Sequence, residues 1–247
     1  MQRIAIPQIV PTQPTQPVFR GVAIENPWLL PGYRRNLPHV RFEGATYFVT
    51  FRLADSIPEA IAREWQAERE AWLRVRGIEP DWKKTEPARF LSALNALPYS
   101  ERQARTREQH RKYFIELDRC HGGCLLARTH GVVSRALDYF DAQRVWIGDF
   151  VVMPNHVHAL VQPFLGVRLE KWLYSVKRFT SREIKSELAL DLPESMKCGP
   201  VWQPESFDRI VRNRDELAQI RGYIRDNPMK LRPGSFAFRR MPWMDNA

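Results

Sequence analysis

The sequence predicts an α+β fold in which helices pack on an antiparallel sheet. Segments rich in Tyr, Phe, Val, Ile and Thr have the composition of strands, and amphipathic segments at helical spacing lie between and after them. The expected order is strand, helix, inserted section, helix, strand, strand, helix, strand, helix. At 247 residues, the chain is long enough to bury one core with additions.

The first 32 residues are predicted to form an extended arm. Six prolines stand there among Gln and Thr, a composition that resists helix and sheet and buries little surface. The remainder, 33–247, is expected to be a single domain with a helical insertion at about 77–119. Neither a signal peptide nor an apolar stretch of membrane-spanning length is found, so a cytoplasmic protein is expected.

The first half of this domain begins with a strand and continues with helices. Aromatic and β-branched residues predict a strand at 45–53. A helix should start at Pro58 and end at Gly77, with Trp65 and Trp72 among its apolar positions. Residues 100–103 have the form of a capping box that opens a very basic helix toward Leu117. Its cations either contact phosphates or form a solvated face.

The second half contains the remaining strands and helices. The apolar stripe Val132, Val133, Ala136, Leu137 and Phe140 indicates a partly buried helix. Two strands follow at 144–153 and 156–162, with a break at Pro154-Asn155. A long amphipathic helix is expected at 168–188, a last strand at 206–211 and a closing helix at 215–227. The buried side of the long helix should comprise Leu169, Trp172, Leu173, Val176, Phe179 and Ile184.

The net charge favours a polyanionic partner. Lys and Arg number 38 against 28 Asp and Glu, which leaves +10 at pH 7, and nucleic acid is the leading candidate. A merely soluble basic protein is the alternative. Three cysteines make no even-numbered disulfide framework, which fits a reducing cytoplasm. The spacing from Cys120 to Cys124 does not match a zinc or haem motif.

Two histidines in an apolar run suggest a metal site. His156 and His158 are two residues apart in a predicted strand, so both side chains point to one face. Polar rings among Val, Met and Leu need a partner, and ligation of one divalent ion supplies it. The alternative is a pair of half-exposed histidines at the end of an ordinary strand.

Tyr223 and Asn227 are four residues apart on the closing helix, so they share one face. If that face packs near the histidine strand, two nitrogen ligands, one amide oxygen and a phenol meet at an open metal site. A phenol has a pKa of about 10, so it needs help to attack a phosphodiester. Because Asn227 precedes Pro228, it should lie at the helix end.

A larger set of motifs accompanies these residues. Val152-Met153-Pro154-Asn155-His156-Val157-His158 is matched later by Tyr223-Ile224-Arg225-Asp226-Asn227-Pro228-Met229-Lys230. Between them stand Ser175 to Ile184, Val201-Trp202-Gln203-Pro204 and Phe207 to Val211. Together these resemble the single-tyrosine HUH (His-hydrophobe-His) transposases, most closely the REP-associated tyrosine transposases of bacteria. The resemblance is dense from about 120 to 231 and thinner from 33 to 57.

The resemblance implies an RRM-like HUH fold and a transposase reaction on single-stranded DNA beside imperfect palindromes. Tyr223 would form a covalent 5′-phosphotyrosine link and release a 3′-hydroxyl, with His156, His158 and Asn227 holding Mg²⁺ or Mn²⁺. Imidazole ligands alone would also suit zinc. The enzyme would act as a monomer or homodimer near the bacterial nucleoid.

Contacts with DNA phosphates are predicted for basic residues near the motifs. These are Lys177, Arg178, Arg182, Arg212 and Lys230. Tyr33, Arg34 and Arg35 are a further hypothesis, as contacts to the foot of a DNA hairpin.

Several alternatives stay open. Tyr174 is a rival nucleophile, although its neighbour four residues on, Arg178, cannot ligate a cation. A non-catalytic RRM-like binder of single-stranded nucleic acid would show the same charge and sheet. A histidine-triad hydrolase would want a third histidine where Leu160 stands. Flanking DNA decides between a mobile element and a domesticated host enzyme.

Overall fold

The computed structural model describes residues 17–22, 32–34, 38–192 and 194–245, so most of the predicted arm lies outside the described residues. The chain divides into two compact units. We call residues 1–53 with 125–247 the sheet unit, and residues 54–124 the helical unit. Each is described by itself.

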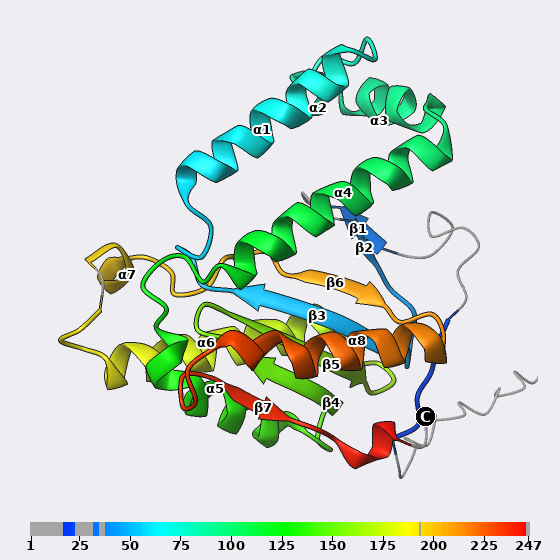
Figure 1. Ribbon diagram of the computed structural model, residues 1–247. Coiled ribbons are helices and arrows are strands. Elements are labelled where there is room, and N and C mark those ends of the chain that lie inside the picture. The colour runs from blue at the N-terminus through cyan, green and yellow to red at the C-terminus, as the bar shows by residue number, and fades with distance from the viewer. Residues whose placement is uncertain (1–16, 23–31, 35–37, 193, 246–247) are drawn as a thin grey trace, which may run out of the picture. The chain divides into compact units, whose positions relative to one another are not determined.

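The sheet unit is built on five antiparallel strands in the order β6-β3-β5-β4-β7 (Figure 1). The bounds are β3 Tyr47–Arg52, β4 Val145–Val152, β5 His156–Pro163, β6 Phe207–Ile210 and β7 Ala237–Arg239. The predicted α+β class is confirmed, and four of the strands lie where the sequence places them. The fifth, β7, pairs with the edge of β4 and was not predicted, because three residues give too short a pattern.

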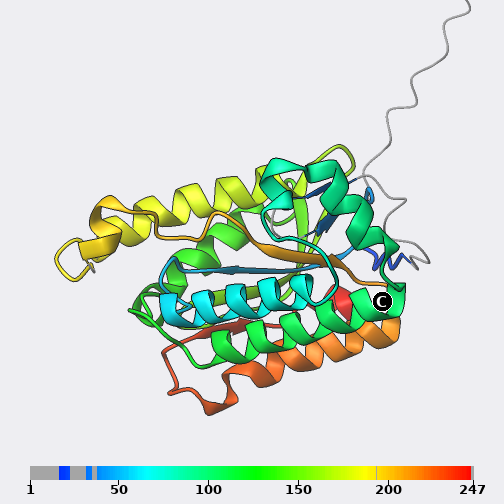
Figure 2. The ribbon, with the colours of Figure 1, turned by 90° about the horizontal axis from the view of Figure 1, so that it is seen from above.

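Helices cover both faces of this sheet. The bounds are α5 Leu126–Phe140, α6 Leu169–Glu187 and α8 Arg214–Asp226. Figure 2 shows α6 and α8 on opposite sides of the strands. The alternation of side chains along β3 agrees with this arrangement. The Phe51 ring packs on Trp202, whose indole N–H donates to Thr180 of α6. The neighbouring Thr50 points to the other face, where it contacts His158 on the α8 side.

The buried stripes of α5 and α6 follow the expected pattern with one exception. All five predicted positions of α5 are buried, and so are five of the six on α6. Phe179 is 40 % exposed, so its predicted burial is wrong. The next residue, Thr180, takes the buried position instead, and its hydroxyl accepts the Trp202 indole hydrogen bond.

The described part of the N-terminal segment lies against the sheet unit. The backbone N–H of Thr46 donates to the Arg20 carbonyl, and that of Val22 donates to the Val211 carbonyl. Residues 17–22 of the predicted arm are therefore docked by backbone hydrogen bonds. Further along, β1 (Gly32–Arg34) pairs with β2 (Pro38–Val40).

The helical unit is larger than the insertion that the sequence suggests. It contains α1 Glu59–Arg74, α2 Trp82–Thr85, α3 Pro87–Ala96 and α4 Tyr99–Asp118. The unit begins at residue 54, because Leu73 of α1 is buried in one cluster with Ile78 and Phe90. The helix predicted from Pro58 thus belongs to this unit.

The start of α4 differs from the prediction. No side-chain capping hydrogen bond forms, because the helix begins one residue before the expected cap, after Pro98. Two of its five cations form ion pairs with carboxylates: Lys112 with Glu68, and Arg105 with Glu108. Residues 54–124 hold 13 Lys and Arg against 12 Asp and Glu, so nearly all the net positive charge belongs to the rest of the chain. This balance favours a solvated face over a phosphate-binding helix.

Shorter elements complete the structure. They are α7 Glu194–Cys198 and the 3₁₀ turns η2 Asn227–Lys230 and η3 Pro242–Met244. Among the described residues, no helix combines the length and apolar character needed to cross a bilayer.

Candidate active site

The two histidines lie at the start of β5, as predicted, and both are fully buried. Val157 between them points to the opposite face, so the two rings are neighbours. The Nε2 atoms of His156 and His158 are 2.9 Å apart. Complete burial excludes the alternative of half-exposed histidines at an ordinary strand end.

Hydrogen bonds orient both rings. His156 Nδ1 lies 2.7 Å from the side-chain oxygen of Asn155, which can only accept, so Nδ1 carries the proton and Nε2 a lone pair. His158 Nδ1 lies 2.7 Å from the Thr50 hydroxyl. When that hydroxyl accepts, the Nε2 lone pairs of both rings converge on one point.

Burial keeps both imidazoles neutral. Desolvation, helped by the charge of Arg52, lowers the pKa of His156 to about 3. Desolvation and the neighbouring His156 ring lower the pKa of His158 well below its ordinary value. At neutral pH both rings therefore offer lone pairs, which is the form that binds metals.

The spacing of the ring nitrogens fits a shared cation. Nitrogen ligands lie about 2.1 Å from zinc, and oxygen ligands lie about as far from magnesium. Two ligand atoms at that distance and about 90° apart are roughly 3 Å from each other. The observed 2.9 Å agrees with that value. The pair suits a divalent ion, and its nitrogen donors alone do not select among such ions.

Tyr223 of α8 completes the cluster. Its hydroxyl is 3.2 Å from His158 Nε2, and the two rings are 5.1 Å apart. The ring also meets Phe48 edge-on, and Phe48 stacks on His158. Because the next residue, Ile224, is buried, Tyr223 lies at the margin of the helix-sheet contact.

Asn227 continues the last turn of α8. Its φ of −54° and ψ of −46° are helical despite the following proline, and its backbone N–H donates to the Tyr223 carbonyl. The residue therefore stands one turn beyond Tyr223 on the same side of the helix, and Pro228 opens η2. The expected placement at the helix end is confirmed, whereas ligation by its amide stays a prediction.

The rival nucleophile lies elsewhere. Tyr174 is 65 % exposed on α6, which covers the sheet face opposite to the histidines. Among the described tyrosines, the site contacts single out Tyr223.

The predicted phosphate-binding residues do not form one group. Lys177, Arg178 and Arg182 are on α6, so the sheet lies between that helix and Tyr223. The ammonium group of Lys177 donates to the carbonyls of Gln203, Pro204 and Glu205 and so holds a loop. Arg178 and Arg182 are exposed.

Of the other candidates, Arg212 and Lys230 lie close to α8 in the chain, whereas Arg34 and Arg35 lie near the start of the sequence. Arg212 donates to Glu216 through its backbone and its side chain, while Lys230 is exposed in η2. Arg34 is in β1, with its side chain outside the described part, and Arg35 lies outside the described residues altogether.

Three further residues lie on the sheet face that carries the histidines and were not predicted from the sequence. Asn155 stands directly before His156, so the motif itself could have suggested it. Thr50 reaches His158 only through the register between β3 and β5, which no local pattern reveals. The Arg209 guanidinium lies 5.9 Å from the Phe48 ring, on the strand next to β3.

Known proteins resemble this chain in the segment that carries the candidate site. A family model described as "Transposase IS200 like" matches residues 131–227, which include both histidines, Tyr223 and Asn227. A solved structure described as a REP-associated tyrosine transposase bound to a REP hairpin is similar at 15 % identity and a TM-score of 0.38. The alignment covers 81 % of this chain and 74 % of the chain of that structure. No curated protein matched.

Proposed function

Because a family model for IS200-like transposases matches residues 131–227, we propose that this chain is a transposase of that kind, which cuts and rejoins single-stranded DNA with Tyr223 as the nucleophile. The family match confirms the resemblance drawn from the motifs. The match implies a transposase-type activity in general, and we infer the residues, the intermediate and the DNA.

One observation supports the proposal most strongly. The Tyr223 hydroxyl is 3.2 Å from His158 Nε2, which is 2.9 Å from His156 Nε2. A nucleophile and a ligand pair from distant parts of the chain thus meet at one point. Such an arrangement fits nucleophilic catalysis with electrophilic assistance.

The proposed step is a transesterification. The Tyr223 oxygen attacks the scissile phosphorus, a Tyr–O–P bond forms, and the P–O3′ bond breaks. The phenol loses its proton and the departing 3′ oxygen gains one, so a 5′-phosphotyrosine and a 3′-hydroxyl result. Because one phosphoester replaces another, the reverse attack by a 3′-hydroxyl rejoins DNA without ATP.

The residues proposed to hold the divalent cation are His156, His158 and Asn227. When bound, Mg²⁺ or Mn²⁺ would withdraw charge from a non-bridging phosphate oxygen. The protein's own part is to keep both imidazoles neutral by burial and to orient them through Asn155 and Thr50. Phe48 packs against both the His158 and Tyr223 rings, which limits their motion.

We propose a DNA hairpin with a single-stranded flank as the substrate, in the bacterial cytoplasm. The motif resemblance and the positive charge outside residues 54–124 support this choice. The exposed cations Arg178 and Arg182 would contact phosphates away from the cleavage point, because α6 covers the other sheet face. Lys230, exposed in η2 just after Asn227, would contact a phosphate nearer to it. Arg212, Lys177, Arg34 and Arg35 remain candidates, and the enzyme would work as a monomer or homodimer.

A denaturing gel tests the proposal. Purified protein is incubated with labelled hairpin DNA and Mg²⁺ or Mn²⁺, and an adduct that survives denaturation is expected. Tyr223→Phe should abolish the adduct and leave DNA binding intact, whereas the control Tyr174→Phe should keep both. Full adduct formation in EDTA would show that the reaction needs no divalent metal. Binding without any adduct would favour the non-catalytic RRM-like binder.

A further inference from the structure

Arg209 of β6 lies on the sheet face that carries the histidines. Paired residues on neighbouring strands share a face, and Thr50 of β3 is paired with His158. Two residues away on β3, Phe48 is paired with Arg209, so Arg209 belongs to the same face. The Phe48 ring packs against the His158 and Tyr223 rings. The Arg209 guanidinium lies 5.9 Å from the same ring, which places it beside the proposed cleavage site.

The Arg209 side chain is open to solvent and has unused hydrogen-bond donors. It is 42 % exposed. A guanidinium carries five N–H groups, and among the described residues that of Arg209 makes one hydrogen bond, from Nη1 to Glu216 at 2.7 Å. The remaining donors can bind two oxygens of a phosphate side by side, which is the geometry that guanidinium groups favour.

The charges around Arg209 favour an anion. The Glu216 carboxylate accepts hydrogen bonds from both Arg209 and Arg212, so two cations share one anion. Desolvation lowers the pKa of Arg209, and the nearby charge of Arg212 adds to this effect while Glu216 opposes it. Glu216 itself is buried, so it does not face an approaching ligand. A phosphate beside Arg209 would therefore neutralise the excess positive charge of the cluster.

Arg209 and Tyr223 are reached along one side of α8. Glu216, the partner of Arg209, is seven residues before Tyr223, which is two turns or roughly 10 Å along the helix. A strand whose scissile phosphate lies at Tyr223 would therefore bring the phosphate of a neighbouring nucleotide to Arg209.

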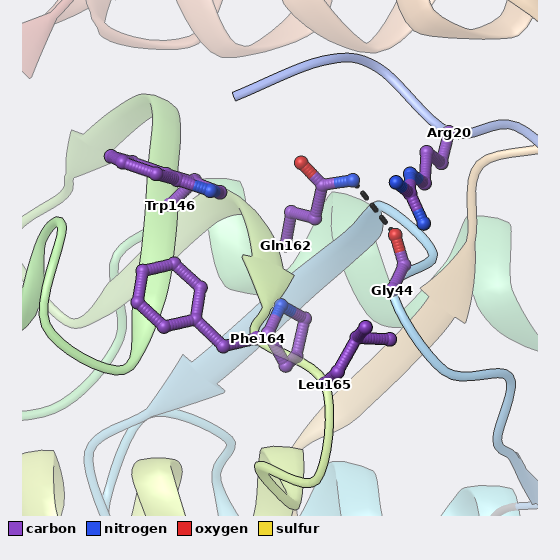
Figure 3. Close-up of a pocket in the computed structure, with 7 residues that line it drawn as sticks. Arg20, Gly44, Trp146, Gln162, Phe164 and Leu165 are labelled. Atoms are coloured by element: carbon purple, nitrogen blue, oxygen red, sulfur yellow. Dashed lines mark hydrogen bonds between the residues drawn. The ribbon is translucent and has the colours of Figure 1, made fainter. Parts of the chain in front are cut away.

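The far end of this sheet face is closed by the chain itself. Near the end of β5, the Gln162 side chain donates to the carbonyl of Gly44 (Figure 3). It also donates to the carbonyl of Val18, so residues 17–22 cross the end of the sheet that is remote from the histidines. A DNA strand that leaves the histidines along β6 would meet Arg209 before it reached this segment.

We infer that Arg209 binds a phosphate close to the scissile one and so fixes the course of the single strand beside β6. The inference rests on the proposed function, because it needs single-stranded DNA at Tyr223. The contact is to a phosphate and not to a base, since Phe48 beside the guanidinium is only 3 % exposed and offers no surface for stacking.

Methylphosphonate scanning tests the inference. Single phosphates of a hairpin DNA with a single-stranded flank are replaced in turn by uncharged methylphosphonate, and dissociation constants are measured by fluorescence anisotropy. The protein carries Tyr223→Phe so that cleavage does not interfere. At one position of the flank, the replacement should weaken binding about fivefold, the upper value for an exposed ion pair. With Arg209→Gln added, the same replacement should cost less than about twofold, because the contact is already lost.

Arg239 provides a matched control at the other edge of the sheet. It lies on β7, whereas Arg209 lies on β6. Its side chain is 44 % exposed, pairs with the Asp138 carboxylate and lies 5.4 Å from the Phe150 ring, so its contacts are of the same kinds as those of Arg209. Arg239→Gln should keep the fivefold effect at the sensitive phosphate.

The salt dependence of binding gives a second readout. Arg209→Gln should lower the slope of the logarithm of the binding constant against the logarithm of the salt concentration by about 0.7, the value of one phosphate contact with a single strand. Arg209→Lys retains a cation without the fork of donors, so it should keep the slope and lose part of the fivefold effect. Thermal melting checks that the variants fold.

An anchoring role alone would give a different result. If Arg209 only holds the start of α8 through Glu216, Arg209→Gln would weaken binding to every substrate by the same factor and leave the slope unchanged. That result would overturn the inference, and so would an equal effect of Arg239→Gln. Failure of the proposed function looks different: the sensitive phosphate would still depend on Arg209, while the protein with its native Tyr223 formed no covalent adduct.

Discussion

At the scale of single residues, the site depends on two neutral imidazoles held by short hydrogen bonds. Asn155 and Thr50 each hold one ring nitrogen at 2.7 Å, so the opposite nitrogens face each other and Tyr223. Groups behind a ligand set its tautomer and its affinity for metal. Thr50 is therefore a positioning residue: it acts through the His158 ring and not by contact with the phenol or the proposed cation.

Replacing Thr50 tests this role. Thr50→Val keeps the shape and removes the hydroxyl, which should weaken Mn²⁺ binding about 10- to 100-fold. Thr50→Ser retains the hydroxyl and should stay within about threefold of the original protein. Calorimetric titration with Mn²⁺ in the absence of DNA measures both. Equal affinities in all three proteins would contradict the assignment.

The stability of the metal-free protein should depend on these histidines below neutral pH. Burial lowers the folded-state pKa of His156 to about 3 and that of His158 well below its ordinary 6.5. Above pH 6.5 both rings are neutral whether folded or unfolded. As the pH falls from 6.5 toward 3, the unfolded chain takes up protons that the folded one cannot. Stability should fall by about 1.4 kcal/mol per pH unit for each histidine.

Urea unfolding at pH 7, 6 and 5 in EDTA measures this loss. A protein with both His156→Gln and His158→Gln lacks the titrating groups, so its stability should change less steeply with pH. Parallel curves for the two proteins would show that the histidines are not the source.

At the scale of elements, the orientation of α8 determines whether Tyr223 reaches His158. Arg221 lies on this helix two residues before the tyrosine, and its guanidinium pairs with Asp149 of β4 at 2.7 Å. Asp149 is only 3 % exposed. At the start of the helix, the Asn213 side chain accepts the Glu216 backbone N–H as an N-cap.

Breaking the buried ion pair should loosen the helix. Arg221→Met leaves the Asp149 carboxylate buried without its cation, which should cost roughly 3 kcal/mol of unfolding free energy and slow adduct formation. The control is Arg225→Met, one turn later, whose pair with Asp226 is exposed and screened by solvent, so its loss should change the unfolding free energy little. Urea denaturation compares them. Similar losses in both variants would argue against Arg221 as the anchor.

The sequence predicts long elements well and short or non-local ones poorly. The strands at β3, β4 and β5 and the helix at α8 follow from clear periodicity. The edge strand β7 and the Thr50–His158 contact could not be predicted, because both depend on pairing between distant segments. Proximity in the sequence is a poor guide to DNA contacts near the site. Arg178 and Arg182 are only 22 and 26 residues after His156, yet α6 carries them on the other face of the sheet.

At the scale of the whole molecule, charge and function are unevenly distributed. The helical unit is nearly neutral although α4 is rich in arginine, because its carboxylates match its cations. The family match lies entirely outside that unit. Composition alone indicated a nucleic-acid partner but could not say which part of the chain provides the positive charge. The unit boundary at residue 54 also depends on tertiary packing of Leu73.

Peptide mapping of the protein–DNA adduct tests the central claim most directly. Adduct formed with hairpin DNA and Mn²⁺ is digested with nuclease and trypsin, and the peptide that retains a nucleotide is identified by mass spectrometry. The account predicts a 5′-phosphotyrosine at Tyr223, lost in protein with His156→Ala and His158→Ala. A nucleotide on Tyr174, or an undiminished adduct without the histidines, would contradict it.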